Sequence, residues 1–101
     1  MASVSLAGIR PLVMAHLNVV NGGVTVTTYT VSSNPMTKRL VVFHDATGNK
    51  EIFFDIDNDP TSDSMPIMAN MYFVIEVENG EEIRFINTSG GAVHIHLTEI
   101  R

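Results

Sequence analysis

The feature that most restricts the fold of this chain is a repeated alternation of apolar and polar residues, interrupted by turn residues. The last such segment, V-H-I-H-L-T-E-I at 93–100, has apolar residues at positions 93, 95 and 97 and histidines at 94 and 96. Successive side chains of a strand point to opposite faces, so this segment has one apolar and one polar face. Such segments recur about every ten to twelve residues, with Gly- and Asn-rich turns between them. This pattern predicts an all-β fold, a single small β-sandwich or jelly-roll-like domain.

The other predicted strands are rich in Val, Ile, Thr and aromatic residues, the types that favour strands. They lie at 24–31, 38–44, 51–56, 71–77 and 82–87. The turn residues D-A-T-G-N at 45–49 predict that 38–56 forms a β-hairpin. Segment 65–70 is apolar but contains Pro66. Because proline cannot donate a ladder hydrogen bond, this segment is predicted to be an edge strand or an extended link.

The length of 101 residues predicts one domain. We assign residues 21–101 to the β-sandwich, and residues 1–20 to either an extended arm or its first strand. Within them, 11–20 fits a helical face as well as a strand, and we favour the strand. The first residues lack a basic leader, which argues against a signal peptide, and no apolar run is long enough to predict a membrane span.

Charge and cysteine content exclude several classes of function. The net charge is −5, and the six Lys and Arg residues are scattered, whereas nucleic-acid binding needs a concentrated basic surface. The absence of cysteine excludes disulfides, thiolate metal sites and a cysteine nucleophile. Charged residues make up 17% of the chain, below the usual share of about 25%. Either part of the surface is covered by other protein, or the surface is an ordinary one rich in Thr and Asn.

The histidines are the first candidates for a binding site. His94 and His96 project from one face of a strand, and two such imidazoles can converge on a metal ion. His44 ends another predicted strand and would supply a third ligand if the two strands are neighbours, with Asp45 or Glu99 completing the site. The alternative is that these histidines are the polar outer face of a sheet.

Segment 80–94, G-E-E-I-R-F-I-N-T-S-G-G-A-V-H, resembles the cupredoxin pattern that precedes a ligand histidine. A blue-copper centre needs a thiolate beside two histidines, and this chain contains no cysteine. Copper chemistry of that kind is therefore excluded, and the resemblance implies only a strand–turn–strand arrangement. A cupin-type enzyme is a weaker alternative, because cupin sites use more histidines and a glutamate spread over two strands.

The acidic loop D-I-D-N-D at 55–59 begins like a calcium loop. An EF-hand starting at Asp55 would need glycine and glutamate where this chain has Pro60 and Pro66, so that match fails. Two alternatives remain: an irregular calcium loop using Asp57, Asp59 and Asp63, or a solvated acidic turn.

Catalysis is not expected from these residues. The carboxylates near the turn at 78–81 all look solvent-facing, namely Glu76, Glu78, Glu81 and Glu82. General acid–base catalysis would need paired carboxylates in an apolar setting. The chain also lacks a nucleophile elbow and a phosphate-binding glycine loop. We therefore expect a non-enzymatic protein without a cofactor.

Three of the methionines occur at intervals of three residues, which does not suit one face of a strand. Methionine fills irregular gaps in cores and adaptable interfaces. We predict that Met71 packs in the core and that Met65 and Met68 make subunit contacts.

The order of segments resembles that of small structural proteins of tailed-phage virions, including head decoration (cement) proteins and tail components. The resemblance is carried by the Thr/Val strand, N-P turn, basic pair and apolar strand within 24–56, the Asp/Pro/Thr/Ser loop at 57–64, and G-E-E-I-R-F-I-N with its Gly-Gly turn. It is one of organisation and carries no catalytic residues.

The resemblance implies a β-sandwich located in the virion that binds the major capsid protein or other virion subunits. It also implies a homo-oligomer, a trimer or dimer, in which many weak contacts act together. An apolar N-terminal arm and exposed sheet edges could contribute by strand addition. The contact residues expected there are Leu6, Ile9, Leu12 and Met14.

Overall fold

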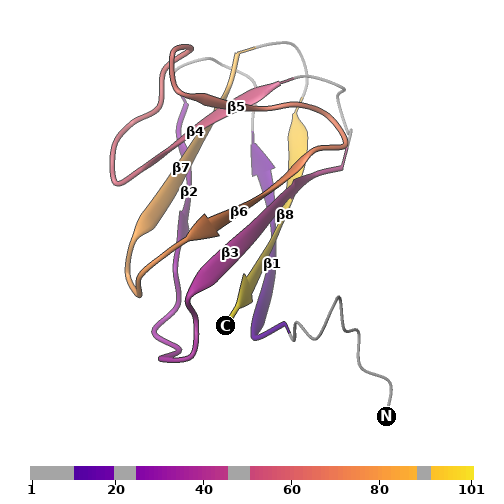
Figure 1. Ribbon diagram of the computed structural model, residues 1–101. Coiled ribbons are helices and arrows are strands. Elements are labelled where there is room, and N and C mark those ends of the chain that lie inside the picture. The colour runs from indigo at the N-terminus through magenta and orange to yellow at the C-terminus, as the bar shows by residue number, and fades with distance from the viewer. Residues whose placement is uncertain (1–10, 20–24, 46–50, 89–91) are drawn as a thin grey trace.

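The computed structural model describes residues 11–19, 25–45, 51–88 and 92–101, and these form an all-β domain (Figure 1). The eight strands are β1 (Val13–Val19), β2 (Thr27–Thr30), β3 (Arg39–His44), β4 (Ile52–Ile56), β5 (Met65–Ile67), β6 (Tyr72–Glu76), β7 (Glu82–Asn87) and β8 (Val93–Ile100). They make two four-stranded antiparallel sheets, the first in the order β1-β8-β3-β6 and the second in the order β2-β7-β4-β5. The predicted all-β sandwich is confirmed.

The strands pair in a nested order. β1 pairs with β8, β2 with β7, β3 with β6 and β4 with β5, and further ladders join β3 to β8 and β4 to β7. The chain therefore crosses from one sheet to the other at every connection except the one between β4 and β5. Eight strands arranged in this way form a jelly roll.

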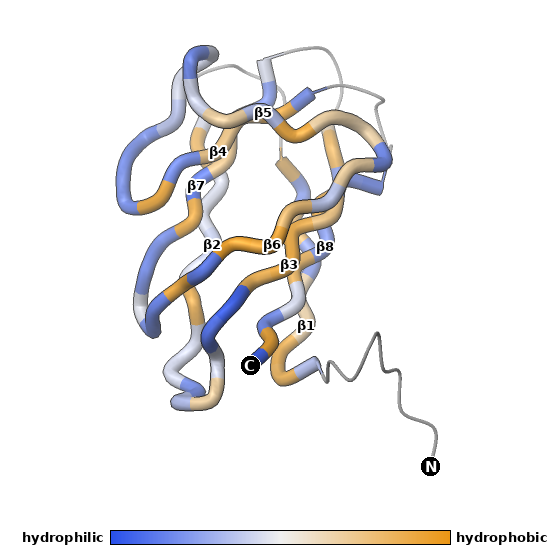
Figure 2. The backbone as a smooth tube through the Cα atoms, viewed as in Figure 1, coloured by the Kyte–Doolittle hydropathy of each residue, from blue (hydrophilic) through white to orange (hydrophobic). Residues whose placement is uncertain are grey.

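The core lies between the two sheets and is built from the inward positions of each strand. Leu40 and Val42 of β3, Ile83 and Phe85 of β7, and Ile95 of β8 are all fully buried. The alternation of hydropathy along the chain is visible in Figure 2. The predicted faces of the last strand are confirmed, because Val93, Ile95 and Leu97 are buried while the two histidines lie on the opposite face.

The predicted hairpin over 38–56 is wrong. β3 belongs to the first sheet and β4 to the second, so the chain crosses the sandwich between them. The other local predictions agree better with the structure. β5, which contains Pro66, is an edge strand of the second sheet, and Val13–Val19 is the edge strand β1 of the first.

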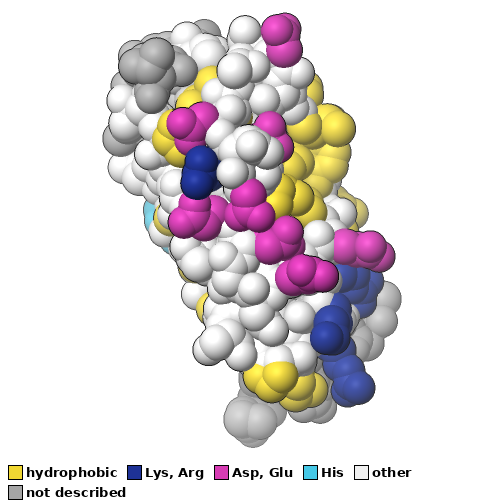
Figure 3. Space-filling view, turned by 90° about the vertical axis from the view of Figure 1, so that its left-hand side faces the viewer, with side chains coloured by type: hydrophobic (Ala, Val, Ile, Leu, Met, Phe, Trp, Pro, Cys, Tyr) yellow, Lys and Arg dark blue, Asp and Glu magenta, His cyan; other side chains and the backbone are white. Residues whose placement is uncertain are grey.

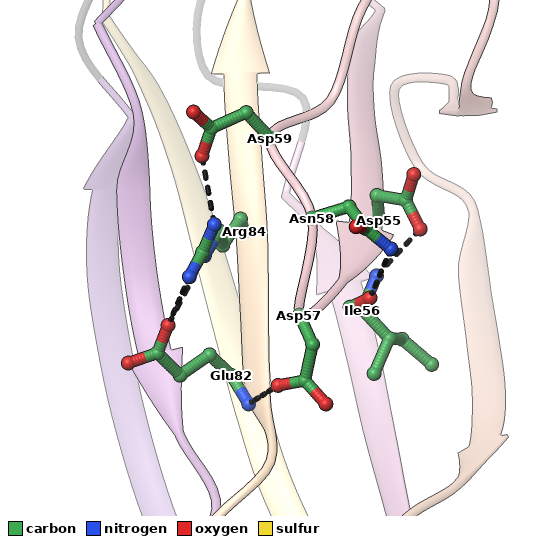
Figure 4. Close-up of polar contacts among 7 residues, drawn as sticks. All are labelled: Asp55, Ile56, Asp57, Asn58, Asp59, Glu82 and Arg84. Carbon is green, nitrogen blue, oxygen red and sulfur yellow. Dashed lines mark hydrogen bonds and ion pairs between the residues drawn. The ribbon is translucent and has the colours of Figure 1, made fainter.

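The turn after β4 depends on Asp57, which has a left-handed backbone with φ 58°. Its carboxylate accepts a hydrogen bond from the backbone N–H of Glu82 at 2.8 Å (Figure 4). Its own N–H donates to the Glu82 carbonyl at 2.7 Å. Asp and Asn tolerate this backbone conformation better than other residues with a Cβ. The side chain thus fastens the turn to the start of β7.

Replacing Asp57 with alanine is expected to lower the free energy of unfolding by about 1–2 kcal/mol, because the left-handed strain remains while the hydrogen bond is lost. Asp57→Asn should cost less, since its amide oxygen can accept the same bond. Urea denaturation of the three proteins measures both values. Equal stability of Asp57→Ala and the parent chain would contradict this account of the turn.

Candidate functional site: a histidine–aspartate cluster beside an apolar strip

The outer face of the first sheet brings together side chains from strands that are far apart in sequence. One row across this face runs His16, His96, Phe43, Tyr72, since these residues are paired in register from β1 through β8 and β3 to β6. The next row runs Met14, Thr98, Val41, Val74. Aligned residues on one face of neighbouring strands lie in contact distance. This face therefore joins a histidine-rich end to an apolar part.

The histidine-rich end forms a cluster of His16, Asp45, His94 and His96. The His16 ring centroid lies 4.8 Å from that of His94 and 4.9 Å from that of His96. Nε2 of His96 lies 2.9 Å from a carboxylate oxygen of Asp45. Asp45 follows β3, and its backbone N–H donates to the His94 carbonyl at 3.4 Å, which keeps it beside β8.

Three members of this cluster lie close enough together that they could hold a cation. Ligand atoms of His16, Asp45 and His94 all lie within 4.8 Å of one another. In the described part of the chain, this is the group of three or more such residues that could hold a metal ion. His16 is exposed, whereas Asp45 and His94 are half-buried.

The structure does not bring His44 to His94 and His96. β3 and β8 are neighbours, but His44 is paired with Ile95 and its side chain is fully buried on the inward face. The two strand histidines instead point outward, which also argues against a cupin-type site inside the sandwich. His16, which sequence reasoning did not single out as a ligand, takes the place expected for His44.

Glu99 is likewise not part of the cluster, because its side chain is fully buried between the sheets. Its carboxylate accepts hydrogen bonds from the hydroxyls of Tyr29, Ser32 and Thr37, the last at 2.7 Å, and from the Ser32 N–H at 2.9 Å. Burial opposes ionisation, but the bonds from Ser32, Tyr29 and Thr37 outweigh it, so the pKa of Glu99 lies below its ordinary value. Burial and the bond to Glu99 raise the pKa of Tyr29.

The acidic loop does not gather its carboxylates into a cation site. Asp57 binds the backbone of Glu82, and Asp59 pairs with Arg84 at 2.9 Å (Figure 4). Asp63 is exposed in the following turn. Acidic side chains spread over this side of the molecule, with hydrophobic ones at its margin (Figure 3). The arrangement is that of a solvated acidic surface crosslinked by one arginine, which has its pKa raised chiefly by the bond to Glu82.

Three further carboxylates border an open hollow at the opposite end of the first sheet. Its lining includes Lys38 and Arg39 together with Glu76, Glu78 and Glu81. Glu76 and Glu78 are exposed, as expected, while Glu81 and Glu82 are half-buried. Charges of both signs at the surface offer no apolar setting in which a carboxylate would gain acid–base reactivity.

The apolar part of the outer face, called here the apolar strip, consists of Met14, Val41, Phe43, Tyr72 and Val74. Met14 is 73% exposed, Tyr72 65% and Val74 50%. Hydrophobic residues run along β3 and β6 in Figure 2. A strip of large apolar side chains on one sheet face is a typical feature of a contact surface.

Only some of the predicted contact residues lie at this strip. Met14 belongs to it, and Leu12 is half-buried just before β1. Met65 and Met68 are exposed at or next to the edge strand β5, in the second sheet. Leu6 and Ile9 lie outside the described residues. The prediction that Met71 packs in the core is wrong, because Met71 precedes β6 and is 41% exposed.

Comparisons with known proteins give no match: no protein-family model, no curated protein and no solved structure is significantly similar to this chain. Among the residues that the structure describes, there is no helix with the length and apolar character needed to cross a membrane.

Proposed function

We propose that this chain is a non-enzymatic structural protein of a bacteriophage virion, and more specifically a capsid decoration protein that binds the major capsid protein. The jelly-roll topology supports the proposal, because this architecture serves repeatedly in viral capsid domains. The organisation of the sequence, which resembles small virion proteins of tailed phages, supports it independently. Fold alone does not define function, so a feature of the surface is needed to indicate what the chain binds.

The observation that carries the proposal is the apolar strip. Val41 and Phe43 are half-buried on β3, and Tyr72 and Val74 stand exposed beside them on β6. Burying apolar surface contributes about 25 cal/mol per Å², so a partner that covers these side chains gains affinity directly. A protein whose task is assembly needs such a surface more than it needs a reactive group.

The occupant that we propose for the strip is a second copy of the chain. A two-fold contact uses the same surface on both subunits, and an apolar sheet face meets this requirement because it can pack face to face with itself. The oligomer then presents several capsid-binding surfaces at once, which multiplies weak individual contacts into firm attachment. The edge strands β1 and β5 are further surfaces for that attachment.

Replacing both Tyr72 and Val74 with lysine is expected to convert an oligomer into a monomer, because four charges would face one another across a two-fold contact. The molar mass, measured by light scattering after size-exclusion chromatography, checks this. The matched control is Thr28→Lys, which adds a charge at an exposed position of β2 in the second sheet and should leave the mass unchanged.

Two results would contradict the proposal. One is a parent chain that stays monomeric at every concentration and does not cosediment with phage capsids. The other is a genomic neighbourhood without any gene for a capsid or tail protein.

A further inference from the structure

We propose that His16, His94 and Asp45 form a binding site for a divalent transition-metal ion, for which Zn²⁺ is the best match. Two imidazoles and a carboxylate are a ligand set that zinc uses in open, three-residue sites. Imidazole ligands favour zinc, copper, nickel and iron over magnesium and calcium, which prefer oxygen ligands alone. This inference is independent of the proposed role in a virion.

The distances allow the three side chains to close on one ion. Their ligand atoms lie within 4.8 Å of one another, whereas nitrogen and oxygen ligands in a tetrahedral zinc site are about 3.3 Å apart. The closure required is about 1.5 Å at most, which small side-chain rotations supply at a partly exposed position. The strand register places His16 diagonally beside His94, since His16 is paired with His96 and Asn18 with His94.

His96 acts as the supporting residue of this site. Its Nε2 lies 2.9 Å from Asp45, so it can donate a hydrogen bond to the carboxylate and hold it toward the other two ligands. Ligating groups are commonly fixed in this way by a neighbouring hydrogen bond. Without a metal ion, the same contact is an ordinary His–Asp pair, and the experiment must distinguish the two.

The position of the site gives the ion a structural consequence. His16 comes from the edge strand β1, His94 from β8, and Asp45 from the chain just after β3. An ion held by all three would fasten the edge strand to the middle of the first sheet. Because it binds the folded chain, it would also raise the thermal unfolding temperature.

The test is titration of the full chain with Zn²⁺ by calorimetry, and with Co²⁺ by visible absorption, which reports the coordination geometry. We expect one ion per chain. Loss of a supporting residue typically weakens metal binding by about 10–100-fold, so His96→Ala should fall in that range, and His16→Ala and Asp45→Asn should weaken binding by more than about 100-fold. The matched control is Asp63→Asn, an exposed aspartate of the acidic loop, which should bind as the parent does.

A second measurement keeps the test independent of how well the variants fold. In the parent chain, zinc should shift the NMR signals of the His16 and His94 rings and leave the buried His44 ring unchanged. The inference is overturned if zinc does not bind, if His16→Ala and Asp45→Asn bind it like the parent, or if His44 shifts in place of His16.

Discussion

Replacing Glu99 with glutamine is expected to lower the free energy of unfolding by about 3 kcal/mol. The carboxylate is fully buried and accepts four hydrogen bonds, one of them from Tyr29 of β2, in the opposite sheet. A glutamine amide keeps one accepting oxygen, but it carries no charge, and its NH₂ group requires the Ser32 and Thr37 hydroxyls to accept where they now donate. A hydrogen bond to a charged group contributes about 1.5–3 kcal/mol, and the change weakens several such bonds at once, so we expect a loss of about 3 kcal/mol.

Acid should reveal the same network. The pKa of Glu99 in the folded chain lies below its ordinary value, so on acidification the unfolded chain takes up this proton first. The contribution of Glu99 to stability is therefore fully present above about pH 5 and is lost as the pH falls through the folded pKa. Urea denaturation at several pH values should show this loss in the parent and a weaker pH dependence in Glu99→Gln. Glu78→Gln, at an exposed position, serves as the control and should follow the parent.

Replacing Phe85 with alanine is expected to lower the free energy of unfolding by about 4 kcal/mol, the value typical of an aromatic side chain removed from a close-packed core. Phe85 is fully buried in β7. Its ring lies 6.3 Å from Phe54 of β4, which in turn lies 6.1 Å from Phe73 of β6, in the other sheet. The change thus opens a cavity beside the aromatic contact between the sheets.

Phe85→Leu should cost about 1.5 kcal/mol, because leucine fills most of the same volume. Tyr72→Ala removes an aromatic ring of similar size from an exposed position, so it should change the stability of the monomer little. Chemical denaturation measures all three. A loss for Phe85→Ala no larger than that for Tyr72→Ala would show that this part of the core is not packed as described.

The fold class could be predicted because alternation reports directly on which side of a strand meets the core. Residues 93–98 alternate with a period of two, and their apolar and polar faces lie where the pattern puts them. The edge position of β5 followed in the same way from Pro66. These are local signals, each decided by a few neighbouring residues.

The pairing of strands could not be predicted, because it is decided by contacts between distant segments. A turn sequence such as 45–49 shows that the chain reverses, but it does not show whether the next strand joins the same sheet or the facing one. That is why the turn residues predict a hairpin over 38–56 that the structure does not contain. The prediction for His44 is wrong for a related reason: K-R-L-V-V-F-H at 38–44 is apolar on both sides and does not reveal its inward face.

The candidate metal site likewise combines residues that local sequence signals indicate with one that only long-range pairing reveals. The sequence indicates His94 and Asp45 as candidates, but His16 reaches them only because β1 pairs with β8. A sequence signal for it did exist, since the polar residues His16 and Asn18 alternate with apolar residues in the segment 13–19. Its distance from His94 along the chain hid the relation. The core prediction for Met71 is wrong because its apolar character does not reveal that it lies just before a strand, where it is exposed.

The nested order of the strands has a consequence for synthesis on the ribosome. β1 emerges early, yet its neighbour in the sheet, β8, is the last strand to be made. Until then the inward side chains of β1, such as Leu17 and Val19, have no finished core to enter, whereas β4 and β5 can pair soon after translation. Long-range pairing of this kind is slow to form and leaves apolar segments open to aggregation. Burial of these β1 side chains therefore has to wait until β8 has been made.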